Sequence, residues 1–132
     1  MLVFTASGCL AHGAPAGYPE RPERLAGVLE HLRAEGFAVE EVPAGGAGGD
    51  QRRALREAVT AVHPEAYVAR FERAVARGDS LFDSADNPVG DGTAEAAWSA
   101  VAATLAAADR AATGEAAFAA VRPPGHHAER ET

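Results

Sequence analysis

The sequence has a single cysteine, no long apolar run and no cluster of basic residues. Cys9 alone excludes an internal disulfide and a thiolate cluster for zinc, so a reducing compartment is the simpler expectation. Residues 1–10 lack the basic segment of a signal peptide, and no stretch approaches the roughly 18 to 20 apolar residues that span a bilayer. We therefore expect a soluble cytoplasmic protein with no membrane partner.

Basic residues are also outnumbered by acidic ones, 12 against 19, which gives a formal net charge of −7. This balance argues against a nucleic-acid partner, because neutralising phosphates requires clustered Lys and Arg. The 132 residues are 47% hydrophobic and 23% charged, as in globular proteins. That length suits one domain, or part of one.

Strand and helix signals alternate along the chain. The predicted strands are residues 2–5, 37–42 and 116–121. The predicted helices begin at Pro22, Gln51, Pro64 and Thr93, and end near Gly36, Val62, Arg77 and Ala112. This order is typical of a parallel α/β sheet, and the apolar run 116–121 is typical of a central strand covered on both faces.

Helical spacing also predicts which side chains face the core. The first helix places Leu25, Val28, Leu29 and Leu32 on one face, and the second places Leu55, Val59 and Val62 on another. Thr93 is the expected cap of the last helix. The many alanines of that helix and its Trp98 suit close packing against a sheet.

Two loops offer alternatives that we weigh separately. The glycine-rich residues 44–49 lack the spacing of a phosphate-binding loop and are interpreted as a flexible insert. Asp83, Asp86 and Asp91 lack the closing glutamate of a calcium loop, so a hydrated surface loop is favoured over a cation site.

The charged and isolated polar residues outside these loops have simpler expected roles. Glu20 and Arg24, at the start of the first helix, are expected to be surface charges unless the preceding loop folds over a pocket. His12 and His63 are isolated histidines, for which packing or loop roles are favoured over metal binding.

Residues 122–128, Arg-Pro-Pro-Gly-His-His-Ala, are the most informative segment. His126 and His127 are adjacent imidazoles whose pKa suits proton transfer near neutral pH, which favours a general acid/base pair over a merely solvated loop. A shared metal ion is less favoured, because adjacent side chains diverge. The two prolines stiffen the loop, and Gly125 permits a turn or the close approach of a ligand. His12 also follows a strand, so both loops should open at the same sheet edge.

The segment RPPGHHA resembles the active-site motif of the histone deacetylase family, in the form of class II enzymes and bacterial acetylpolyamine amidohydrolases. Residues 18–25 resemble the family's His-Pro-Glu-x-Pro-x-Arg-Leu, with Tyr18 in place of its histidine. Residues 61–68 resemble its Val-His-x-x-x-Tyr segment, and residues 86–97 its Asp-Thr-Pro loop and following helix. The likeness spans essentially the whole chain.

This resemblance implies an arginase/deacetylase-like α/β fold, in which helices cover both faces of a parallel sheet in three layers. It also implies hydrolysis of the amide of an acetylated lysine or polyamine, with zinc polarising the acetyl carbonyl and its bound water. By the same resemblance His127 is the general base and His126 assists it. Asp86 would hold substrate at the rim, and Arg24 would line an inner channel.

The family's zinc ligands, an Asp-x-His pair and a later Asp, follow the histidine loop, as does its catalytic tyrosine. The resemblance therefore implies that residues 1–132 are the amino-terminal part of one domain, without zinc or activity alone. We expect exposed strand edges to associate with a complementing carboxyl-terminal chain or another copy. Two alternatives stay open: a degenerate, non-catalytic binding module, and a self-contained metal hydrolase using His12, His63 and the histidine pair.

Overall fold

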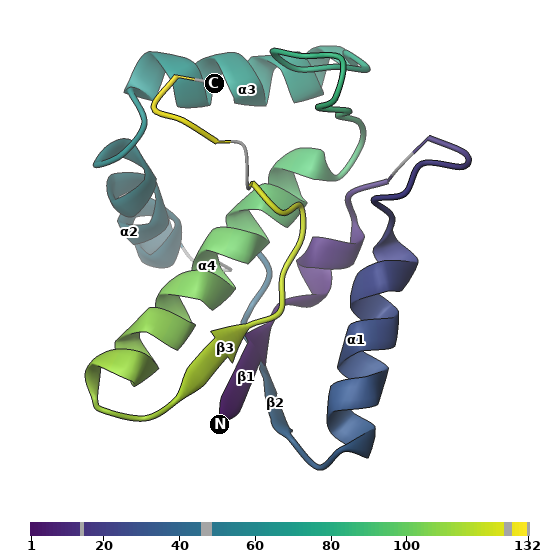
Figure 1. Cartoon of the computed structure of the whole chain (residues 1–132). Helices are drawn as coiled ribbons and strands as arrows, with labels where there is room; N and C mark the ends of the chain where they lie inside the picture. Colours follow the sequence, from purple (N-terminus) through teal and green to yellow (C-terminus); the bar gives the residue numbers. More distant parts are fainter. Residues whose placement is uncertain (14, 46–48, 126–127, 132) are drawn as a thin grey trace.

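The computed structural model describes residues 1–13, 15–45, 49–125 and 128–131. Three parallel strands form its sheet, in the order β2-β1-β3: β1 (Leu2–Thr5), β2 (Ala38–Glu41) and β3 (Ala117–Ala119) (Figure 1). Val3 lies in register with Val39 on one side and with Phe118 on the other. The predicted parallel α/β sheet is therefore confirmed, and the first strand of the chain is the middle strand of the three.

Four helices and one short 3-10 turn accompany the sheet. They are η1 (Ser7–Leu10), α1 (Pro22–Ala34), α2 (Gly49–Thr60), α3 (Glu65–Arg77) and α4 (Thr93–Ala112). The four predicted helices are confirmed, and no end differs from its predicted position by more than two residues. Among the described residues, no helix has the length and apolarity needed to cross a membrane.

Helices α1 and α4 cover opposite faces of the sheet (Figure 1). Successive strand side chains point to opposite faces, so β1 contributes to two cores. Buried Val3 packs with Leu25 of α1, whereas buried Phe4 packs with Ala103 and Ala107 of α4. The result is the expected three-layer arrangement of helix, sheet and helix.

Trp98 does not pack against the sheet, contrary to our prediction. It is buried with Leu55 of α2 and Val68 of α3, in a cluster that includes Ala102. Trp98 and Ala102 are one helical turn apart and form a row beside that of Ala103 and Ala107. One row of α4 thus faces the sheet, and the neighbouring row faces the other helices.

The apolar run 116–121 differs from the predicted central strand. Only Ala117–Ala119 forms β3, which is an edge strand of the described sheet, and Phe118 is 48% exposed. Beyond the strand, the Thr5 hydroxyl donates a hydrogen bond to the Ala120 carbonyl, 2.8 Å away. An apolar run reports the hydrophobicity of a strand, but it does not report which neighbours the strand has.

Two residues predicted to face the core are exposed. Val28 of α1 is 47% exposed, and Val62, just beyond the end of α2, is 61% exposed. The buried positions are Leu25 and Leu29 in α1 and Leu55 in α2. The buried stripe of each helix is therefore narrower than its apolar stripe in the sequence.

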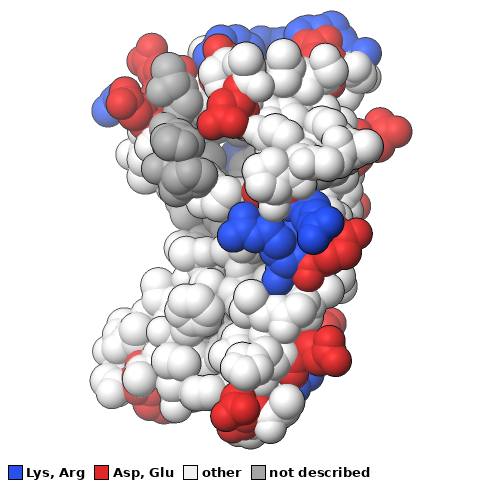
Figure 2. All heavy atoms as spheres, turned by 45° about the vertical axis from the view of Figure 1, so that its right-hand side comes forward, with Lys and Arg blue, Asp and Glu red and all other residues white. Residues whose placement is uncertain are grey.

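In Figure 2 basic and acidic side chains lie beside one another in groups, and broad uncharged areas separate these groups. On this face the basic side chains do not form a continuous stripe, in keeping with the charge balance of the sequence.

Gly92, rather than Thr93, is the N-cap of α4, so the predicted cap is wrong by one residue. Gly92 has φ +81°, and an added Cβ would lie 2.4 Å from the Ala11 carbonyl oxygen. Only glycine allows both this backbone conformation and this close approach. The Thr93 side chain is left to bond elsewhere, as described below.

We predict that Gly92→Ala lowers the free energy of unfolding by roughly 2–4 kcal/mol, because it adds backbone strain and a steric clash. Gly114→Ala is the matched control, since Gly114 has φ +89° but open space around its Cβ position. The control should lose only about 1–2 kcal/mol. Urea denaturation measures both losses, and equal losses would show that the contact with Ala11 adds nothing.

Candidate functional site

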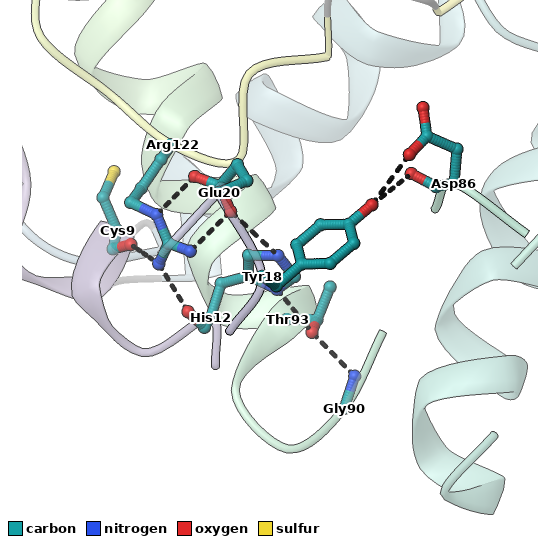
Figure 3. Close-up of polar contacts among 8 residues, drawn as sticks. All are labelled: Cys9, His12, Tyr18, Glu20, Asp86, Gly90, Thr93 and Arg122. Atoms are coloured by element: carbon teal, nitrogen blue, oxygen red, sulfur yellow. Dashed lines mark hydrogen bonds and ion pairs between the residues drawn. The ribbon is translucent and has the colours of Figure 1, made fainter. Parts of the chain in front are cut away.

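The loops that follow β1 and β3 meet at the carboxyl edge of the sheet, where Arg122 joins them (Figure 3). The Arg122 side chain is 3% exposed. Its Nε and Nη2 donate to the two carboxylate oxygens of Glu20, at 2.9 and 2.7 Å. Its Nη1 donates to the carbonyls of Cys9, at 3.3 Å, and of His12. The expectation that the two loops share one sheet edge is confirmed as far as Arg122.

Glu20 is therefore a partner of a buried arginine and not the surface charge we predicted. Its side chain is only 22% exposed. Hydrogen bonds from Arg122 hold the pKa of the Glu20 carboxyl below its ordinary value, although partial burial opposes this shift. The two residues are 102 positions apart in the chain, so local sequence around Glu20 carries no sign of its partner.

His12 lies beside this ion pair and is buried. Its Nδ1 is 2.9 Å from the Thr93 hydroxyl, and its Nε2 is 3.7 Å from the Glu20 carboxylate. A proton on Nε2, facing the carboxylate, leaves Nδ1 to accept from Thr93, whose oxygen in turn accepts the Gly90 N–H at 2.9 Å. Burial lowers the pKa of His12, and the Arg122 charge lowers it further. His12 thus has the packing role favoured by the sequence.

A second contact fixes the acidic loop. The Tyr18 hydroxyl donates to Asp86 Oδ1 at 2.8 Å, and this carboxylate raises the pKa of Tyr18 (Figure 3). Asp83 instead pairs with Arg70, at 2.7 Å. Asp83 and Asp86 therefore bond different partners and do not converge on one point. This agrees with the surface loop that the sequence favours over a cation site.

The other predicted site residues are placed as follows. Gly125 is exposed and has φ +57°, and its carbonyl accepts the Ala128 N–H at 3.0 Å. Arg24 is exposed in the first turn of α1, and its charge contributes to lowering the pKa of Glu20. His126 and His127 lie outside the described residues.

No group of three His, Cys, Asp or Glu side chains among residues 1–13, 15–45, 49–125 and 128–131 could hold a metal ion. His12 is committed to Thr93 and Glu20, and the His63 ring bonds the Arg130 carbonyl at 3.1 Å. The described residues therefore do not fit a zinc site.

Sequence reasoning missed Glu20 and Arg122 as partners. The available signal was the position of Arg122: a charged residue directly after an apolar run that is predicted to be buried requires a counter-charge. The sequence did not indicate which of the acidic residues provides it.

We predict that stability falls as the pH drops below about 6.5, because the unfolded chain then protonates His12 whereas the folded chain, with its lowered pKa, does not. His12→Gln should remove this loss. Glu20 contributes a separate loss below about pH 4.5, where the unfolded chain binds the proton first. Urea unfolding at several pH values measures the slope, with His31→Gln on the exposed side of α1 as the control. An unchanged slope in His12→Gln would contradict the assignment.

Comparison with known proteins identifies the family. The histone deacetylase domain matches residues 18–132. A probable deacetylase from Archaeoglobus fulgidus is 37% identical over 123 residues, which cover 91% of this chain and 33% of that protein. The crystal structure of the HDA15 HD domain matches with a TM-score of 0.74 and 25% identity, over 99% of this chain and 38% of that chain.

The chain thus spans about a third of the length of its curated relative. The structural match shows that its sheet and four helices are an incomplete α/β fold of the arginase/deacetylase type. By sequence and by fold, the chain belongs to the histone deacetylase family.

Proposed function

We propose that this chain is the amino-terminal part of a zinc-dependent deacetylase that hydrolyses the amide of an acetylated lysine or polyamine. Family membership supports an amide hydrolase. The observation that carries the proposal is the attachment of the RPPGHHA segment, through buried Arg122, to the carboxyl edge of the sheet. In parallel α/β sheets this edge is where ligands bind.

The chemistry assigned to this chain is proton transfer by its histidine pair. His127 would take a proton from the attacking water, and His126 would assist electrostatically or in proton transfer. Both roles rest on the motif, since the two residues lie outside the described part. The prolines before them limit the conformations of the loop and so lower the entropy cost of presenting the pair.

Zinc dependence rests on the family and not on a site in this chain, because the described residues offer no set of three ligands. The ligands would come from an Asp-x-His pair and a later Asp in the remaining part of the domain. It follows that the 132-residue chain alone should lack both zinc and turnover.

Asp86 is proposed to hold the substrate at the rim of the site. Its side chain is exposed and already accepts a hydrogen bond from Tyr18 through Oδ1. A carboxylate has about four lone-pair sites, so Asp86 retains capacity to accept N–H groups from a peptide or amine. Tyr18 would then fix the direction in which that capacity points.

A non-catalytic binding module is the alternative, and the missing set of metal ligands in the described residues favours it. The exposed edge strand β3 would give such a module a surface for pairing with another chain. The proposed deacetylase and this module differ in whether the full-length protein releases acetate.

We predict that the full-length protein releases acetate from an acetyl-lysine peptide or an acetylpolyamine, and that a chelator abolishes release until zinc is restored. His127→Ala should lower kcat by about 10²–10⁴-fold, because proton transfer by a positioned side chain contributes that much. His31→Ala, at an exposed position, is the control. Release that is insensitive to chelation or to His127→Ala would reject the proposal, and absence of release would favour the binding module.

A further inference from the structure

We propose that Arg122 is the positioning residue of the histidine loop, acting through what we call the Arg122 network: Arg122, Glu20, His12 and Thr93. The inference rests on the proposed function, because it concerns the loop that carries the histidine pair. Arg122 itself contacts protein groups of the network and is four positions before His126 in the chain.

The hydrogen bonds of Arg122 determine its orientation. The guanidinium donates to both oxygens of one carboxylate and to two main-chain carbonyls, so Nε, Nη1 and Nη2 all have partners. The paired bonds to Glu20 are bidentate, which restrains the plane of the guanidinium as well as its position. A lysine would supply the charge as a single point and could not reproduce this geometry.

The acceptors of Arg122 belong to a different part of the fold from the loop it begins. Cys9 is in η1, His12 follows η1, and Glu20 precedes α1. Glu20 is also 3.7 Å from His12, which bonds Thr93 at the start of α4. The network therefore links the start of the histidine loop to elements from both faces of the sheet.

This link controls where the loop leaves the sheet. The last ladder contacts of β3 are followed by the Thr5 hydroxyl bond to the Ala120 carbonyl and by the packing of Val121 against the core. Arg122 comes next, and hydrogen bonds hold its side chain. Pro123 and Pro124 then fix two φ angles, so a change in the direction of Arg122 is carried forward to Gly125. Misplacement of a reacting group by about 1 Å can cost roughly 10²-fold in rate.

A purely stabilising role explains the arrangement less well. Removing an arginine from water is costly, and the desolvation of a buried ion pair can offset its electrostatic attraction. The described residues leave no buried side-chain nitrogen or oxygen without a partner, which includes every such atom of the network. A fully bonded polar group of small net benefit chiefly specifies one geometry.

The test uses Arg122→Lys and Glu20→Gln in the full-length protein. Arg110→Lys is the matched control, because Arg110 pairs with Glu115 at 3.1 Å on the surface of α4 and lies away from the network. Initial rates of acetate release give kcat and KM. Hydrogen–deuterium exchange of segments 7–13 and 120–131 reports their order without requiring activity.

We expect each network variant to lower kcat by about 10–10²-fold with KM within about twofold, since position is lost and substrate binding is retained. Exchange should accelerate at least about fivefold in segment 120–131, while Arg110→Lys leaves both readouts unchanged. Unchanged kcat together with unchanged exchange in a folded variant would overturn the inference. So would an effect confined to KM.

Thermal unfolding of each variant separates misfolding from misplacement. If Arg122→Lys does not fold, Glu20→Gln still decides the question. Glutamine has nearly the same shape as glutamate and keeps one acceptor oxygen, but it lacks the negative charge. If the wild-type protein releases no acetate, the proposed function fails, and the exchange measurement alone decides whether Arg122 orders the loop.

Discussion

The buried charge of Arg122 is the constraint on which the carboxyl edge of this sheet depends. A guanidinium carries a positive charge and five N–H donors, so its burial beside β3 requires a negative partner and several acceptors. Glu20 and the carbonyls of Cys9 and His12 meet this requirement. The loop after β1 must therefore return past the end of β3 before α1 begins.

The same edge depends on two close approaches between the amino-terminal half of α4 and the segment that follows β1. An added Cβ at Gly8 would lie 2.2 Å from the Ser99 hydroxyl, and one at Gly92 would lie 2.4 Å from the Ala11 carbonyl. These contacts bring the start of α4 near enough for Thr93 to bond the His12 ring. Glycine at both contacts thus allows α4, on one face of the sheet, to approach the segment after β1. The same segment leads into α1 on the other face.

Local periodicity was sufficient to predict the elements, because strand alternation and helical spacing are properties of neighbouring residues. It predicted a parallel sheet and the four helices, and the RPPGHHA motif indicated the family. The larger failures concern contacts between residues far apart in the chain. Trp98 faces other helices, Phe118 is on an edge strand, and Glu20 is paired across 102 residues. An apolar or acidic side chain does not encode its partner, so these contacts follow only from the assembled fold.

Tyr18 and Glu20 connect the two parts of the candidate site. Tyr18 bonds Asp86 in the acidic loop, and Glu20 bonds Arg122 at the start of the histidine loop. Two residues of chain span at most about 7 Å, so these two anchors cannot separate without breaking one of them. The spacing between the proposed substrate-holding aspartate and the proposed proton-transfer loop is therefore limited by one short segment. Position 18 carries a tyrosine where the family motif has a histidine, and the hydroxyl of this tyrosine bonds Asp86. The substitution therefore joins the acidic loop to the segment that holds Arg122.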